Sequence, residues 1–165
     1  MAQSVPINID NLARLARERN DDPSWRSLWN AVIRLPAWYG VTTLERPDAP
    51  ALLLAGEPPK PRLFAFTDER RAWRFVNQAP RPVRAPDGSR VASVIRMPLP
   101  QAIRYAAALG QRGVEHVVFN AGHGGAQGFG FPVAALAQLA AALGRPASPA
   151  PSPTPEQPPA AAGEA

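Results

Sequence analysis

The sequence predicts an α+β fold: a single domain with a mixed β-sheet flanked by helices, two of them at the N-terminus. Three observations support this. Between Arg62 and Gln78 an apolar run turns into a helical pattern, so the hydrophobic period changes from two to 3.6. Residues 25–33 carry an amphipathic helical stripe. Other apolar runs of strand length are separated by Gly- and Pro-rich turns, without strict strand–helix alternation.

Two helices are expected before the first strand. Asn8 or Asp10 can cap the first. Asp22 followed by Pro23 starts the second, because aspartate suits the cap and proline the first helical position. The second helix has an apolar stripe at helical spacing, formed by Trp25, Leu28, Trp29, Val32 and Ile33. We interpret its two tryptophans as core anchors rather than as a platform for stacked bases.

The expected strands are short and rich in β-branched, aromatic or other apolar residues. Residues 51–55 and 62–66 are two apolar runs joined by the proline-rich turn 56–61, which indicates an antiparallel hairpin. The other strands are expected at residues 37–44, 91–97, 114–120 and 129–131. Strand order stays open.

Three further helices complete the predicted domain. Thr67 is expected to cap the first, in which Asp68 and Glu69 face the positive end of the helix dipole and Trp73 and Val76 face the core. The second is opened by residues 98–100 and ended by Gly110. The third runs from Pro132 to Gly144.

The domain is expected to span residues 5–144, and residues 145–165 to form a disordered Pro/Ala-rich tail. Seven of the 21 prolines lie between Pro146 and Ala165, a stretch without large apolar side chains, so little could offset the entropy of ordering it. Such a tail could serve as a tether or as a polyproline ligand for another domain.

Charge, cysteine content and the lack of long apolar segments limit the classes of function that this protein could have. The net charge of +5 rises to +7 (18 − 11) when Glu156 and Glu164 of the tail are left out, which could favour anionic partners. The absence of cysteine excludes disulfides and thiol catalysis. No apolar segment resembles a signal peptide or a membrane span, so we expect a cytoplasmic protein that does not contact a membrane.

The glycine-rich loop Asn120–Gly128 is the first candidate site. Its backbone could approach a phosphate, with His123 and Gly124 at its centre. However, it has neither the Lys-Ser/Thr ending of a P-loop nor GxGxxG spacing, which favours a simple turn between strands. The two histidines, His116 and His123, do not form a metal-ligand motif, so neither a metal nor another cofactor is expected.

Two other clusters have a structural and a functional interpretation. Asp68 and Glu69 follow a strand, where α/β sites often form, but adjacent helical residues diverge and dipole compensation explains both. A basic patch could bind nucleic acid, although a solvated face is the simpler interpretation. The patch comprises Arg70, Arg71, Arg74, Arg81 and Arg84, followed by Arg90.

Four segments together resemble the SseB N-terminal domain family, named for enhanced serine sensitivity. They are ARLARERNDDPSWRSLWNAVIRLPAWYGV, RLFAFTDERRAWRFV, RMPLPQAIRYAAAL and GVEHVVFNAG, in order over roughly residues 10–143. The resemblance implies a bacterial α+β protein with no catalytic residues to carry over. The chain departs from the family at Ala121, where proline is frequent, and a Pro/Ala tail replaces the second domain of longer relatives.

We therefore expect a non-enzymatic protein-interaction module, an adaptor or regulatory accessory with a protein partner. Its expected surface comprises the Phe66–Glu69 junction, including Thr67 and Asp68, the Asn120–Gly128 loop, and the rings of Phe129 and Phe131. One alternative is a small-anion or nucleotide-like ligand binder, or an enzyme, using His123 and the glycine loop. Another is nucleic-acid binding through the basic patch.

Overall fold

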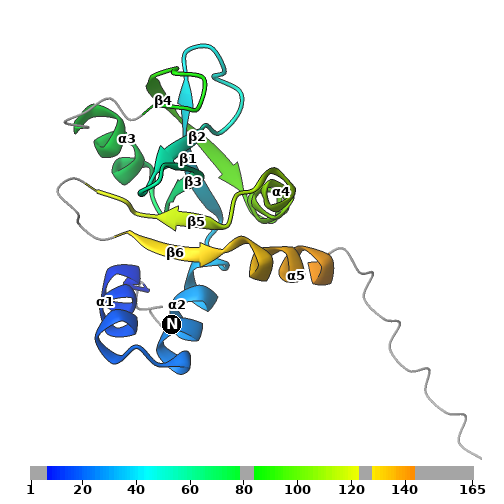
Figure 1. The fold of residues 1–165 in the computed structure, drawn as a ribbon. Coiled ribbons are helices and arrows are strands. Elements are labelled where there is room, and N and C mark those ends of the chain that lie inside the picture. The colour runs from blue at the N-terminus through cyan, green and yellow to red at the C-terminus, as the bar shows by residue number, and fades with distance from the viewer. Residues whose placement is uncertain (1–6, 79–83, 123–127, 144–165) are drawn as a thin grey trace, which may run out of the picture.

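A computed structural model describes residues 7–78, 84–122 and 128–143, and it confirms the α+β fold (Figure 1). The expected tail, residues 145–165, lies outside the described residues. The described elements are α1 (Ile9–Arg19), α2 (Asp22–Val32), β1 (Ala37–Thr43), β2 (Leu52–Ala55), β3 (Lys60–Phe66), α3 (Glu69–Gln78), β4 (Val91–Pro98), α4 (Gln101–Leu109), the 3-10 turn η1 (Gly110–Arg112), β5 (His116–Phe119), β6 (Phe129–Pro132) and α5 (Val133–Leu143).

The strands form one mixed sheet in the order β4-β1-β3-β5-β6. The pair β3–β5 is parallel and the other described pairs are antiparallel, including the predicted β2–β3 hairpin. Since β5 occupies one edge of β3, both β1 and β2 lie along the other edge. There β1 pairs with Ala65 and Phe66, and β2 pairs with the stretch from Lys60 to Leu63.

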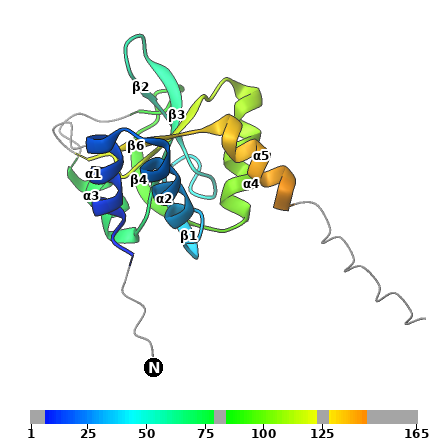
Figure 2. The same cartoon turned by 90° about the horizontal axis from the view of Figure 1, so that it is seen from below.

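Side chains alternate between the two faces of the sheet, and each face has its own apolar cluster. On one face Trp38, Leu63 and Phe119 pack with α1, α2, α4 and α5. On the other face Val41, Phe64 and Phe66 pack with α3. Helices α4 and α5 lie side by side, as both views show (Figures 1 and 2). The four-helix face therefore contains the larger core.

The two N-terminal helices dock against β6, near the other end of the described chain (Figure 1). The ring centroid of Trp29 is 4.2 Å from that of Phe131 and 5.6 Å from that of Phe129. Trp25 stacks on Trp29 at 5.6 Å. Both tryptophans are half-buried and pack against the core, which supports their interpretation as core anchors.

Two of the predicted helix caps are displaced by one residue. Asn8 caps α1, as expected, by accepting a hydrogen bond from the Asn11 N–H (3.0 Å). In α2 the cap is Asp21 rather than Asp22, and its carboxylate accepts from the Ser24 N–H (2.8 Å). In α3 the Arg71 N–H donates to Asp68 (2.9 Å), so Asp68 supplies the bond that was expected from Thr67.

The predicted inward position of Trp73 is wrong. Its side chain is 38% exposed, whereas Ala72 is fully buried and Phe75 and Val76 are half-buried. Successive helical residues are rotated by about 100°, so a helix that turns Ala72 toward the sheet turns Trp73 away from it. Trp73 instead donates its indole N–H to Glu69 (3.3 Å), one turn earlier.

The predicted turn at residues 56–61 also ends too late, because β3 already begins at Lys60 and includes Pro61. Pro61 faces Leu54 of β2. The Leu54 N–H donates to the Arg84 carbonyl (3.3 Å), away from β3, so this pair needs no donor from proline.

Thr42 of β1 carries a hydroxyl that is buried and has no hydrogen-bond partner among the described residues. Such a group costs about 1–3 kcal/mol relative to water. We expect Thr42→Val, which replaces the hydroxyl with a methyl of similar size, to raise the free energy of unfolding by about 1 kcal/mol. Chemical denaturation measures this. Thr42→Ser, which keeps the hydroxyl and loses the methyl, should be destabilising, and stabilisation by Ser rather than Val would contradict the assignment.

Candidate functional site

Two of the predicted site residues, Thr67 and Asn120, are brought together where the parallel strands β3 and β5 end. The Asn120 side-chain oxygen accepts from the Thr67 N–H (3.0 Å) and from its hydroxyl (3.2 Å), and the amide nitrogen lies 3.1 Å from the same hydroxyl. The Asn120 N–H donates to Ala65 (2.9 Å). Asn120 adopts φ +51°, a conformation that asparagine tolerates better than most residues. This Thr67–Asn120 latch joins the two strands.

Asp68, the next predicted site residue, takes part in a surface ion-pair network. Its carboxylate accepts from Arg71 Nε (2.7 Å), and the two terminal nitrogens of Arg71 reach both oxygens of Asp10 on α1. Hydrogen bonding to Asp10 raises the pKa of Arg71 further above its usual value. Asp68 is thus occupied by capping α3 and by pairing with Arg71, which supports the structural interpretation of this carboxylate.

Several other expected surface features are buried or lie outside the described residues. Phe66 is fully buried, and Phe129 and Phe131 are 4% and 6% exposed, so the expectation that these rings lie on the surface is wrong. Instead, these rings point into the core along β3 and β6. His123 and Gly124 lie outside the described residues.

The end of the glycine loop has a structural requirement of its own. A Cβ atom at Gly128 would lie 2.7 Å from the Phe119 carbonyl oxygen and 3.0 Å from a Val118 methyl. The chain passes this close to β5 because β6 pairs with β5 immediately afterwards. A glycine at 128 is therefore explained without any ligand.

Two arginines of the basic patch are engaged by groups of the same chain, and one of them is neutralised. Arg71 is paired with Asp68 and Asp10, and Arg84 donates to the Gly88 carbonyl (3.1 Å). Arg70 and Arg74 are exposed, and Arg81 lies outside the described residues. This arrangement gives no specific support to nucleic-acid binding.

The outer edge of β4 is a feature that the sequence did not reveal. Leu99 N–H donates to the Pro36 carbonyl (3.2 Å), continuing the β1–β4 ladder beyond Ala37 and Pro98. Bonded pairs alternate along an antiparallel ladder, so Val94 and Arg96 direct their N–H and C=O groups away from β1. In the described parts of the chain no strand pairs with this edge. Pro98, the next outward position, has no N–H to leave unpaired.

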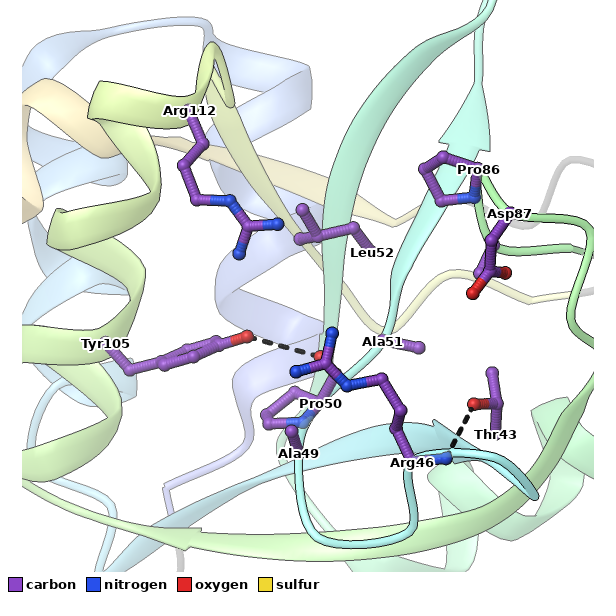
Figure 3. A pocket seen from close by; sticks show the side chains of 11 residues that line it. Thr43, Arg46, Ala49, Pro50, Ala51, Leu52, Pro86, Asp87, Tyr105 and Arg112 are labelled. Carbon is purple, nitrogen blue, oxygen red and sulfur yellow. Dashed lines mark hydrogen bonds between the residues drawn. The ribbon is translucent and has the colours of Figure 1, made fainter.

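Sequence reasoning also missed a pocket between the loop after β1 and the helix α4 (Figure 3). Its walls include Arg46, Tyr105 and Arg112, which lie far apart in the sequence and form no motif. Only the fold brings them together, so no pattern of spacing could have indicated the pocket.

Neither a metal-ligand cluster nor a membrane-spanning helix is found among the described residues. They contain no group of three or more His, Cys, Asp or Glu side chains that could hold a metal ion. His116, at the start of β5, is exposed. Among the described helices none is both long and apolar enough to cross a membrane.

Comparison with known proteins adds no family assignment. The sequence matches no family model, and no curated protein matches it. The resemblance to the SseB N-terminal domain family therefore stays a prediction.

Proposed function

We propose that this protein is a non-enzymatic interaction module that binds an extended segment of a partner protein along the outer edge of β4, in the bacterial cytoplasm. The unpaired edge carries the proposal. An open strand edge is a template for another strand, and many domains bind peptides in this way. β4 has eight residues, of which only Arg96 is charged, so it has little of the charge that usually protects an edge.

The edge offers a defined set of contacts. Val94 and Arg96 each present one donor and one acceptor, and four hydrogen bonds at about 1 kcal/mol each amount to only about millimolar affinity. Side chains of the partner must therefore supply the rest. The half-buried Val94 and Ile95 lie on opposite faces of the sheet and provide apolar neighbours for them. In strand addition the side chains also determine which partner is bound, because the backbone bonds are the same for any sequence.

Arg96→Pro tests the proposal, because it removes an outward N–H while leaving the bonds between β1 and β4 in place. Arg96→Thr is the matched control, since it removes the same charge but keeps the N–H. Peptides selected on the wild-type protein from a displayed random library would be titrated against both variants. We expect Arg96→Pro to weaken binding at least about tenfold relative to Arg96→Thr, because a bond is lost and the ring obstructs the partner strand.

Two results would oppose this function. Equal affinity of the two variants for the selected peptides would place binding elsewhere on the surface. Amide hydrogen exchange supplies the second check, because a bound strand should slow exchange at Val94 and Arg96. Unchanged exchange at both amides would exclude strand addition.

A further inference from the structure

The Arg46–Tyr105–Arg112 pocket is a cavity of about 320 Å³, which is within the usual range for small-molecule sites. Part of its lining is apolar and is called the apolar wall below; it comprises Ala49, Pro50, Ala51, Leu52, Ala85 and Pro86. The pocket lies between α4 and the loop that connects β1 to β2. The backbone N–H of Arg46 donates to the Thr43 hydroxyl (3.3 Å), and the Tyr105 hydroxyl donates to the Pro50 carbonyl (3.2 Å). Both ends of the loop are thereby tied to the body of the domain.

Two guanidinium groups face this cavity without a carboxylate partner. Arg46 extends toward the Tyr105 hydroxyl from the loop, and Arg112 extends into the same space from η1 (Figure 3). Neither forms an ion pair with any acid in the described chain. Burial raises the pKa of Tyr105, and the positive charges of Arg112 and Arg46 oppose that rise.

A single acid, Asp87, lies beside Pro86 on the side of the pocket away from Tyr105 and Arg112 (Figure 3). Hydrogen bonds from Ser89 lower its pKa, with a small contribution from Arg46, so it is ionised near neutral pH. The pocket therefore has two positive groups on one side and one hydrogen-bond acceptor on the other. Paired arginines suit phosphate and carboxylate groups because their N–H donors match the geometry of these anions.

We propose that this pocket binds a small organic anion. A phosphate or carboxylate lies between Arg46 and Arg112, the carbon chain lies against the apolar wall, and a hydroxyl group donates to Asp87. The site is independent of the β4 edge and differs from the glycine loop, which the sequence offered as an alternative anion site.

Titration of the full-length protein, followed by NMR of the arginine side chains and backbone amides at constant ionic strength, tests the proposal. The probes are glycerol 3-phosphate, glycerate, propyl phosphate and inorganic phosphate. We expect saturable shifts with glycerol 3-phosphate or glycerate. Arg46→Gln or Arg112→Gln should weaken binding at least about tenfold, since each removes charge-assisted hydrogen bonds.

Arg104→Gln is the control, because it removes the same charge from an exposed position on α4 beside Tyr105 and outside the pocket walls. It should leave the affinity within about twofold. Equal weakening by Arg104→Gln, or no saturation with either hydroxyl-bearing probe, would overturn the proposal. Inorganic phosphate binding as tightly as glycerol 3-phosphate would overturn the role of the apolar wall. Propyl phosphate binding as tightly as glycerol 3-phosphate would overturn the role of Asp87. Thermal unfolding of each variant would verify that the fold is intact.

Discussion

Trp38→Ala is expected to remove about 3–5 kcal/mol of stability, which is a large part of the 5–15 kcal/mol typical of a whole domain. Trp38 is fully buried at the start of β1. Its ring meets Phe119 of β5 edge-on at 4.9 Å, and its indole N–H donates to the Val32 carbonyl (3.1 Å). The substitution would leave a cavity between the sheet and the helices. It would also remove one of the two hydrogen bonds that the Val32 carbonyl accepts, leaving the one from the Leu35 N–H (3.4 Å). Urea denaturation followed by circular dichroism measures the loss.

Trp38→Phe separates the two contributions. It keeps an aromatic ring against Phe119 and removes the donor to Val32, so we expect a smaller loss of about 1–3 kcal/mol. If the alanine variant were as stable as the wild type, the described position of Trp38 at the centre of the four-helix face would be wrong.

Asn120→Ala is expected to cost about 2–3 kcal/mol, because it acts on both the latch and the backbone. The Thr67 N–H would lose its acceptor. Alanine would also have to adopt the positive φ of Asn120, a conformation that costs a residue with a Cβ about 1 kcal/mol or more. Denaturant unfolding measures the total loss.

Two further substitutions at the latch divide this cost. Asn120→Gly relieves the backbone but not the missing acceptor, so it should lose less than alanine. Asn120→Asp keeps the acceptor for the Thr67 N–H, gives up the amide donor and adds a negative charge. A glycine variant as stable as the wild type would mean that the bond to Thr67 contributes nothing.

The local elements could be predicted because each has its own pattern. The stripe on α2 and the hairpin of β2 and β3 depend on residues that are neighbours in the sequence. Errors arose where a single residue decided where an element begins or which face of a helix is buried. In α3 the buried face is the one that carries the small residue Ala72, and the larger Trp73 points to solvent.

The sites could be predicted only where single segments defined them. Thr67 and Asn120 were each notable as residues that follow a strand, but their contact depends on the parallel pairing of β3 with β5. The open edge of β4 depends on strand order, which is decided by contacts between distant segments. The pocket arginines, Arg46 and Arg112, carry no local signal, because surface arginines occur throughout this chain.

The docking of α2 on β6 sets an order of events during synthesis. Trp29 and its neighbour Phe129 are 100 residues apart (129 − 29). A ribosome adding about 5–20 residues per second needs roughly 5–20 s to make the intervening chain. During that interval the apolar stripe of the nascent N-terminal helices has no strand to cover it. Because the chain is made from its N-terminus, this apolar surface stays accessible to chaperones and to transient self-association until β6 has emerged.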